Sequence, residues 1–248
     1  SSDFGVDGGS LLLDCDTILY NAAFHGSKNT WSSSTLRSGL QGADFLNKTN
    51  VFTEQEKGAI ASSTKAAAAT NDGSGDSSLN YAALSGDTVF VLDAKEASRA
   101  TYGYASNATR KKSNGSSSYG WWLRSPREGS EDKAGFVDGS HVYVGNVSSV
   151  KVGVSPAFNI NLSSVIFSSV ITGTAGEAGA EYKLTLKDDK MNIALTSGQK
   201  VTKSGDTLTI PYTVSGDNSA NATQVSVLVT DKTYDAGDAT IKKYGKLV

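Results

Sequence analysis

Cysteine, histidine and proline are scarce in this chain of 248 residues, which has one cysteine, two histidines and three prolines. The single cysteine, Cys15, excludes internal disulfides and zinc clusters built from several thiolates. The histidines, His25 and His141, stand in no recognisable triad context, so a serine nucleophile would have no evident base. The sequence therefore predicts no catalytic residues, and an enzyme of unrecognised type is kept only as an alternative.

Charged residues are also few, at 19% of the chain with a formal net charge of −2. No basic field is present to attract nucleic acid, and no apolar run approaches the roughly 20 residues that cross a bilayer. Asp72-Gly-Ser-Gly-Asp76 offers oxygen ligands but lacks the bidentate acid of a calcium-binding EF-hand. We predict no nucleic-acid partner, no membrane insertion, no metal and no cofactor.

Helix signals are confined to the first part of the chain. Leucines and alanines at helical spacing over Ser33 to Leu46 predict one helix, with a serine available to cap it. Thr53-Glu-Gln-Glu56 has the pattern of a capping box and predicts a short helix through Ile60. Asp93-Ala-Lys-Glu96 repeats the pattern and predicts another helix.

Strand signals alternate with these helices and with polar loops, which are expected over 66–76 and 107–118. Asp138-Gly139 predicts a tight hairpin turn between two of the strands. Strands are predicted at 11–13, 88–92, 121–123, 135–137, 141–144 and 157–160.

After Asn161 the helix signals vanish and apolar residues alternate with polar ones. Tyr182, Leu184 and Leu186 share one strand face, and similar runs follow at intervals typical of a β-sandwich. Pro211, inside one run, indicates an edge strand or a bulge. We predict an N-terminal domain over 1–162 and an immunoglobulin-like β-sandwich over 163–248 that lacks its last strand or two.

The most distinctive stretch is Tyr119-Gly-Trp-Trp-Leu-Arg-Ser-Pro126, which holds two of the three tryptophans. On a strand, successive side chains point to opposite faces, so Trp121 and Trp122 are expected to have different surroundings. One indole is then available to anchor a core while the other faces a second layer or a ligand.

This stretch resembles a bacterial family, the domain of unknown function 6273, which is common in surface proteins of gut Firmicutes. The resemblance covers about residues 10–162, in order. The other segments that carry it are Thr30-Trp-Ser-Ser-Ser-Thr-Leu-Arg-Ser-Gly-Leu40 with Phe45-Leu46, Phe52-Thr-Glu-Gln-Glu56 with Ile60, Val89 to Ala97, and Gly153-Val-Ser-Pro-Ala157.

The resemblance implies an α+β fold similar to C-type lectins and formylglycine-generating enzymes, with small antiparallel sheets and two or three helices. The sequence departs from the family pattern at two positions. Ser155 stands where the closing motif usually has arginine, and Arg127 stands where a glycine is expected after Ser-Pro. If the family's arginine pairs with a ligand or a carboxylate, this chain is expected to have lost that contact.

Aromatic and basic side chains near these motifs are the candidate ligand-binding residues, because aromatic faces stack on sugar rings and also fill cores. For the tryptophans and for Arg124 a structural role is the competing interpretation. Loops on a rigid scaffold usually carry recognition, which favours the segment from Tyr102 to Ser118. The candidate ligand-binding residues are Tyr102, Tyr104, Arg110, Trp122 and Arg124, and the candidate structural residues are Trp31, Trp121, Pro126, Gly153 and Pro156.

The leading hypothesis is a non-catalytic, extracellular recognition or adhesion module that binds a glycan or a protein. We expect a monomeric fragment of a longer secreted protein, located at the cell surface or in the cell wall of a Gram-positive bacterium. The main alternative is a purely structural stalk segment, whose motif residues only build the core. Full burial of Trp121 and Trp122 together with a disordered loop over Tyr102–Ser118 would favour the stalk.

Overall fold

The computed structural model describes residues 9–68, 78–115, 120–139, 141–233 and 239–246. The chain divides into two compact units, Ser1–Leu186 and Lys187–Val248. The predicted domain boundary at 162/163 lies 24 residues before this division and stays a prediction. The predicted loop over 66–76 lies largely outside the described residues.

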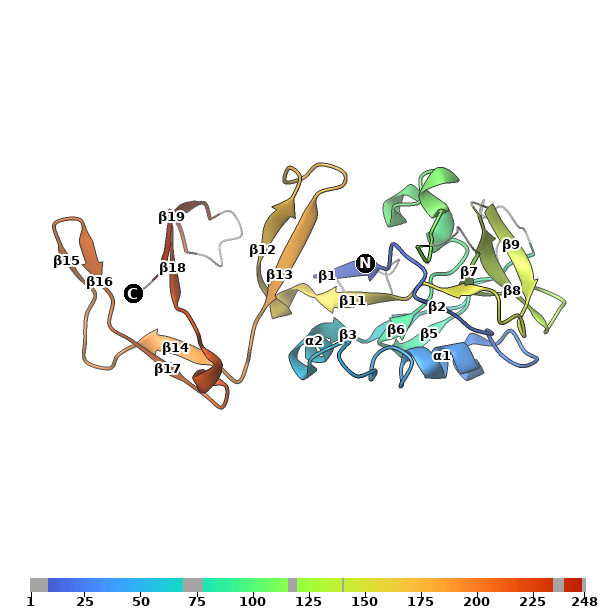
Figure 1. Ribbon diagram of the computed structural model, residues 1–248, viewed down its shortest axis with the longest axis horizontal. Helices are drawn as coiled ribbons and strands as arrows, with labels where there is room; N and C mark the ends of the chain where they lie inside the picture. Colours follow the sequence, from blue (N-terminus) through green and yellow to red (C-terminus); the bar gives the residue numbers. More distant parts are fainter. Residues whose placement is uncertain (1–8, 69–77, 116–119, 140, 234–238, 247–248) are drawn as a thin grey trace. The chain divides into compact units, whose positions relative to one another are not determined.

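The first unit is built on two sheets (Figure 1). One has five strands in the order β2-β10-β7-β8-β9, and in it β10 runs parallel to β7 while the other pairs are antiparallel. Its strands are β2 (Tyr20–Asn21), β7 (Trp121–Pro126), β8 (Lys133–Asp138), β9 (His141–Asn146) and β10 (Gly153–Val154).

The second sheet has four strands, with β1, β3 and β6 all antiparallel to the central β11. These strands are β1 (Ser10–Asp14), β3 (Ile60–Ala61), β6 (Val89–Phe90) and β11 (Ala157–Asn161). A separate two-stranded sheet pairs β4 (Ser63–Lys65) with β5 (Leu84–Asp87). Only four residues separate the starts of β10 and β11, so the segment 153–161 joins both larger sheets.

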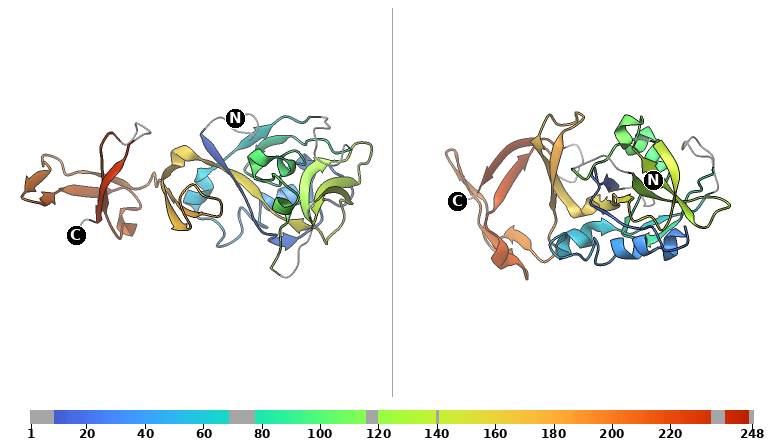
Figure 2. Two further views of the ribbon diagram at one scale, coloured as in Figure 1. Left: turned by 90° about the horizontal axis from the view of Figure 1, so that it is seen from above. Right: turned by 45° about the vertical axis from the view of Figure 1, so that its right-hand side comes forward.

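Two short α-helices lie along one side of the first unit, and a group of 3-10 turns lies on the opposite side (Figure 1 and the right view of Figure 2). The helices are α1 (Thr35–Leu40), capped by Ser34, and α2 (Glu54–Ala59), which has the complete capping box predicted at Thr53 and Glu56. The 3-10 turns of this group are η3 (Glu96–Ser98), η4 (Ala100–Tyr102) and η5 (Ala108–Arg110), whereas η2 (Trp31–Ser33) directly precedes α1 and η6 (Leu162–Ser164) follows β11.

The core of the first unit is a continuous cluster around the tryptophan-bearing strand β7. Phe24 packs between two indoles, with ring centroids 6.1 Å from Trp31 and 5.7 Å from Trp122, and Phe136 covers the other edge of Trp122 at 6.1 Å. All buried side chains of the described residues belong to this unit, and the last of them in sequence is Ile160.

A long hairpin completes the first unit. It pairs β12 (Val165–Thr172) with β13 (Glu181–Leu186), and Gln55 of α2 donates a hydrogen bond to the carbonyl oxygen of Leu186. The described residues of the second unit form three further antiparallel strand pairs and the 3-10 turn η7 (Ser219–Asn221). The pairs are β14 (Asn192–Leu195) with β17 (Tyr212–Ser215), β15 (Thr202–Ser204) with β16 (Thr207–Thr209), and β18 (Ser226–Thr230) with β19 (Ile241–Lys246). The hairpin β15-β16 lies, in sequence, between the two strands of the first pair.

The predicted fold class is wrong in both halves. The first unit is mostly β, with two α-helices of six residues each among the described residues, and does not form the lectin-like α+β domain expected. The predicted helix over Ser33 to Leu46 ends at Leu40 because Gly39 packs against Asp44, where an added Cβ would lie 2.2 Å from Oδ2.

The predicted immunoglobulin-like sandwich is also contradicted. In the second unit each apolar strand pairs in a separate two-stranded sheet, and no described residue of this unit is buried. A sandwich requires two sheets whose inner faces cover each other, and Ile193, Leu195 and Leu208 are instead about half exposed. Alternation indicated strands in this unit but not their stacking, and the run that contains Pro211 divides into β16 and β17, with Pro211 between them.

Candidate functional site

Arg124 lies at the centre of a buried ionic cluster. Its Nη1 is 2.6 Å from Glu96 Oε2, its Nη2 is 2.8 Å from Asp93 Oδ2, and it also donates to the carbonyl oxygens of Val91 and Ala82. Burial works against the charge on Arg124, but Glu96 and Asp93 outweigh it and raise the pKa of the guanidinium. Every part of the guanidinium therefore has a protein partner, and its exposed fraction is zero.

The two carboxylates of this cluster also cap the turn that follows β6. Asp93 accepts from the backbone N–H of Glu96, and Glu96 accepts from the backbone N–H of Asp93, each at 2.8 Å. Lys65 lies 2.6 Å from Glu96 and adds a second cation. The predicted capping box is present, but it opens the 3-10 turn η3 and no α-helix, and its acids are shared with Arg124.

Trp121 and Trp122 have no exposed surface. Their indole N–H groups donate to the carbonyl oxygens of Arg110 at 3.0 Å and Ala22 at 2.7 Å. Trp121 packs beside Tyr104, with ring centroids 5.9 Å apart, whereas Trp122 packs beside phenylalanines. The two rings have separate surroundings, as the strand pattern predicts, and both are core residues.

A second polar cluster lies beneath the turns η4 and η5. Lys112 donates to Asp14 Oδ2 at 2.8 Å, to the carbonyl oxygen of Cys15 at 2.6 Å and to Ser155 Oγ at 2.8 Å. Tyr104 also donates to Asp14 Oδ2. Burial lowers the pKa of Lys112 despite the opposing effect of Asp14. Ser155 carries no charge, unlike the arginine expected at this position. Asp14 nevertheless remains in an ion pair, because Lys112 supplies the cation.

The remaining ligand-binding candidates, Tyr102 and Arg110, are half-buried at the turns above this cluster. Arg110 donates to the carbonyl oxygen of Ala97 and to Asn107, and burial lowers its pKa. Lys65 Nζ lies over the Tyr102 ring, 5.7 Å from the ring centroid. Among the five candidates, Tyr104 and Arg110 contact Trp121, and Tyr102 lies beside a small cavity. Trp122 and Arg124 are completely buried.

The candidate structural residues join strands and turns. Pro156 and Gly153 are buried in the segment that links the two sheets, and the carbonyl oxygen of Pro156 accepts from the backbone of Cys15 at 2.9 Å. An added Cβ on Gly153 would lie 2.5 Å from Ile18, so this close approach requires glycine. Pro126 ends β7, and its carbonyl oxygen accepts from the backbone of Asn80 at 3.0 Å.

The main candidate site is a cavity of about 460 Å³ between η2, the segment before β5 and the end of β7. We call it the Trp31 pocket. Its lining combines aromatic rings, amides, hydroxyls and small apolar groups and contains no charged side chain. The lining residues are Asn29, Thr30, Trp31, Ser32, Ala67, Ala68, Asn80, Tyr81, Ala82, Ala83 and Pro126.

Trp31 gives this pocket an unsatisfied donor. The residue is 2% exposed, and its indole Nε1 is buried with no hydrogen-bond partner among the described residues. The indole N–H groups of Trp121 and Trp122, by contrast, are both bonded to carbonyl oxygens. A buried N–H without a partner costs about 1–3 kcal/mol, so Trp31 lowers the stability of the structure at the wall of this pocket.

Asn29 fixes the wall of the pocket. Its side-chain nitrogen donates to the carbonyl oxygens of Arg127, Ser130 and Lys133, at 3.2, 2.8 and 2.8 Å. These three bonds hold the turn between β7 and β8 against the start of η2. The position of the wall therefore depends on one amide, which sequence reasoning did not single out.

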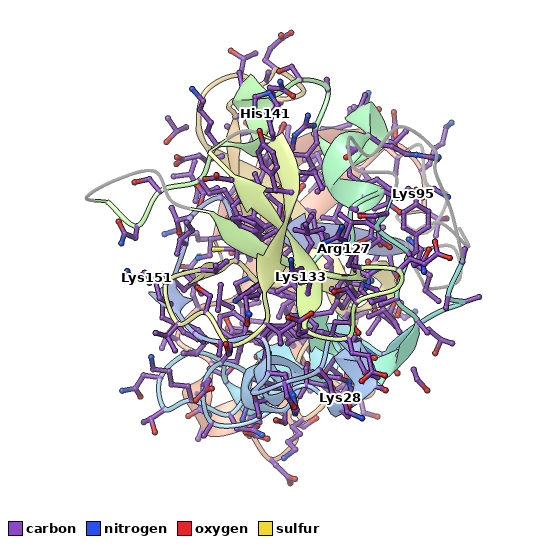
Figure 3. The ribbon with its side chains drawn as sticks, turned by 90° about the vertical axis from the view of Figure 1, so that its right-hand side faces the viewer. Lys28, Lys95, Arg127, Lys133, His141 and Lys151 are labelled. Carbon is purple, nitrogen blue, oxygen red and sulfur yellow. The ribbon has the colours of Figure 1, made fainter. Side chains whose placement is uncertain are left out.

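Three cations border the lining without belonging to it. Lys28 precedes Asn29, Arg127 follows Pro126, and Lys95 Nζ lies 5.4 Å from the Tyr81 ring centroid. Figure 3 labels all three in a view of one side of the molecule. Arg127 stands where the family resemblance led us to expect glycine, and it directly follows the lining residue Pro126 in sequence.

The two histidines are bonded to nearby polar groups outside the Trp31 pocket. His25 Nδ1 accepts from the backbone N–H groups of Ser27 and Lys28, and His141 Nε2 is 2.8 Å from the side-chain nitrogen of Asn107. Among the described residues, no group of three or more His, Cys, Asp or Glu side chains is arranged to hold a metal ion.

The chain belongs to a family described as a domain of unknown function (DUF6273), which matches residues 8–162. The match covers more than half of the chain and includes the tryptophan-bearing strand, the Arg124 cluster and the Trp31 pocket. No curated protein and no solved structure matches the chain significantly. Within the described part of the chain, no helix has the length and apolar character needed to span a membrane.

Proposed function

We propose that this chain is a non-catalytic recognition module of a bacterial surface protein and that the Trp31 pocket holds its ligand. The observation that carries the proposal is the uncharged lining of a 460 Å³ cavity, which combines Trp31 and Tyr81 with amides, hydroxyls and small apolar groups. Binding pockets typically combine apolar walls with a few polar groups that orient the ligand. The Trp31 pocket has this composition.

The lining favours a hydroxyl-rich ligand, and we infer a glycan. Sugar hydroxyls accept and donate hydrogen bonds, while the C–H faces of a sugar ring pack against aromatic side chains. The lining includes the Asn80 amide and the hydroxyls of Thr30 and Ser32, together with the aromatic residues Trp31 and Tyr81. Because the lining has no charged side chain, it has no counter-ion for a buried charge on the ligand.

Glycan arrays and mucin-coated surfaces, probed with the full chain and with Ala83→Trp, test this proposal. Ala83 lies in the pocket lining and is exposed, so an indole there fills the cavity without disturbing the core. Ala105→Trp, at an exposed position outside the lining, is the matched control. We expect binding by the wild type and the control and loss of binding by Ala83→Trp.

The second candidate function is a structural stalk segment, which the burial of Trp121, Trp122 and Arg124 favours. These three motif residues bond only to protein groups. A stalk segment has no use for an open pocket, so its signals on glycans and mucin would be equal for the wild type and Ala83→Trp. That equality would overturn the recognition proposal and leave the stalk.

A further inference from the structure

Asp14 and Lys112 form a buried pair of opposite charges that the function proposed above does not use. Lys112 Nζ is 2.8 Å from Asp14 Oδ2, and the two side chains are 4% and 17% exposed, with Lys112 the more buried. Asp14 is the last residue of β1, whereas Lys112 follows the turn η5, 98 positions further along the chain. The pair therefore joins two distant segments of the first unit.

The carboxylate of Asp14 is bonded less completely than that of Glu96, whose Oε1 is 2.6 Å from Lys65. Both oxygens of Glu96 accept hydrogen bonds, and although burial raises its pKa, nearby cations lower it to about 2. In Asp14, Oδ2 accepts from Lys112 and Tyr104, but Oδ1 is buried with no partner among the described residues. A buried carboxylate with an unpaired oxygen is unfavourable, and such groups tend to lose their charge.

Burial favours the uncharged forms of both members of the pair. It raises the pKa of Asp14 against the effect of Lys112, and it lowers the pKa of Lys112 against the effect of Asp14. The rings of Trp121 and Tyr104 lie over Nζ, with their centroids 4.2 and 5.6 Å away. A lysine amine that is desolvated in this way is an activated nucleophile, and the carboxyl group beside it is an electrophile.

We propose that the side chains of Asp14 and Lys112 condense within the folded chain to form an amide cross-link, with release of one water molecule. The fold holds the amine in contact with Oδ2, which is one covalent bond from the carbon Cγ that the amine attacks. Reacting groups that are held in this way reach effective concentrations of about 10⁵ M or more. The cross-link is independent of the Trp31 pocket and of its ligand.

The reaction balances without any other reactant. Lys112 first passes one proton from Nζ to Oδ2 along their hydrogen bond, which leaves an amine and a carboxylic acid. The Nζ lone pair then forms a bond to Cγ, and Nζ gives a second proton to Oδ2. The bond between Cγ and Oδ2 breaks with its electron pair on the oxygen, which leaves as water.

Two features of the site favour this outcome. Tyr104 donates a hydrogen bond to Oδ2 and stabilises the negative charge that develops on this oxygen as its bond to Cγ breaks. Oδ1 remains as the oxygen of the amide. An uncharged amide oxygen is less costly to bury without a partner than a carboxylate oxygen, so the product removes the unfavourable charge of Asp14.

The mass of the intact, denatured full chain tests the proposal. We expect a mass lower than that of the sequence by one water molecule. A proteolytic digest should contain a branched peptide in which the segment with Asp14 is joined to the segment with Lys112. Lys112→Arg keeps a cation but has no amine to condense, so this variant should have the full mass of its sequence. Lys65→Arg, in the pair with Glu96, is the matched control and should still lack one water molecule.

A wild-type mass equal to that of the sequence would show an ion pair only and would overturn the proposal. A loss of water that persists in Lys112→Arg would also overturn it. So would a digest that assigns the loss to a cyclised aspartate, such as Asp138 before Gly139. The wild-type mass and digest decide the question even where Lys112→Arg fails to fold.

Discussion

Arg124 and Glu96 form a buried ion pair with two contacts, Nη1 to Oε2 at 2.6 Å and Nη2 to Oε1 at 2.8 Å. The pair links the most distinctive strand of the family, β7, to the turn that follows β6. Asp93 and Lys65 complete the cluster, so two cations face two anions in the core. Arg124 is therefore a structural residue of this fold, and recognition has to be sought at the cavities.

Breaking this pair is expected to be costly. Arg124→Met leaves Asp93 and Glu96 buried with Lys65 alone, and we expect a loss of about 3–5 kcal/mol in the free energy of unfolding. Urea denaturation followed by tryptophan fluorescence measures it, because Trp31, Trp121 and Trp122 all lie in the first unit.

The matched control is Lys57→Ala, which removes the surface pair between Lys57 and Glu54, whose side chain is 90% exposed. Such pairs contribute about 0–1 kcal/mol. An Arg124→Met protein as stable as Lys57→Ala would show that the buried cluster contributes little to this fold.

The same cluster predicts a dependence of stability on acid. Burial raises the pKa of Glu96, but Arg124 and Lys65 outweigh burial and lower it from 4.5 to about 2. A carboxyl whose folded-state pKa is depressed stabilises the protein above its unfolded-state pKa, and this contribution is lost as the pH falls through the folded-state value. The loss therefore occurs between pH 4.5 and about 2.

Glu96→Gln removes this titration. We expect the stability difference between the wild type and Glu96→Gln to shrink by about 3 kcal/mol as the pH falls through this window. Asp93 has a pKa raised by burial and by the charge of Glu96, which gives an opposite slope. Because Glu96→Gln removes the second cause, the Asp93 contribution also changes between the two proteins and adds to the measured difference. Urea titrations at several pH values between 2 and 6 measure the difference, and a constant difference would contradict the assignment.

Trp31 and Trp122 predict opposite outcomes for the same substitution. Trp122→Phe leaves the carbonyl oxygen of Ala22 without its donor at 2.7 Å, whereas Trp31→Phe removes an N–H that has no partner. Trp122→Phe should therefore lower the free energy of unfolding by about 1–3 kcal/mol more than Trp31→Phe. Thermal or urea denaturation of both variants measures this difference. Equal losses would indicate that Trp31 Nε1 is bonded in solution.

Two glycines provide a test of the packing between the sheets. Gly153→Ala forces a Cβ to within 2.5 Å of Ile18 and 3.0 Å of the carbonyl oxygen of Gly120, and we expect a loss of about 1–3 kcal/mol. Gly58→Ala, in α2 with no atom within 4 Å of its added Cβ, should gain about 0.5–1 kcal/mol from helix propensity. Differential scanning calorimetry would show opposite shifts, and shifts of the same sign would contradict this packing.

Local patterns predicted the elements of the first unit more reliably than their arrangement. The capping box at Thr53 and the hairpin turn at Asp138-Gly139 depend on neighbours in sequence and are confirmed. The helix expected over Ser33 to Leu46 is wrong after Leu40, where the chain turns and the backbone N–H groups of Gly42 and Asp44 both donate to the carbonyl oxygen of Gly39. In the C-terminal part, apolar residues alternate with a period of two residues. This alternation predicted strands but carried no information on which sheets stack.

The candidate site was harder to predict than the elements. Trp122 was a candidate ligand contact with a structural role as the competing interpretation, and its burial depends on Phe24 and Phe136, which are far apart in sequence. Trp31, expected to be structural, instead lines the larger pocket with an unpartnered N–H. No local signal distinguishes a satisfied indole from an unsatisfied one, because the acceptor belongs to another segment of the chain.

The central claim is that the Trp31 pocket is where this module binds its ligand. The most direct test is the dissociation constant for the strongest glycan on the array, measured for the wild type, Ala83→Trp and Ala105→Trp by isothermal titration calorimetry. The account predicts that Ala83→Trp weakens binding by at least about 100-fold, because the indole occupies the space of the ligand, while Ala105→Trp binds like the wild type. Equal dissociation constants for all three proteins would contradict it.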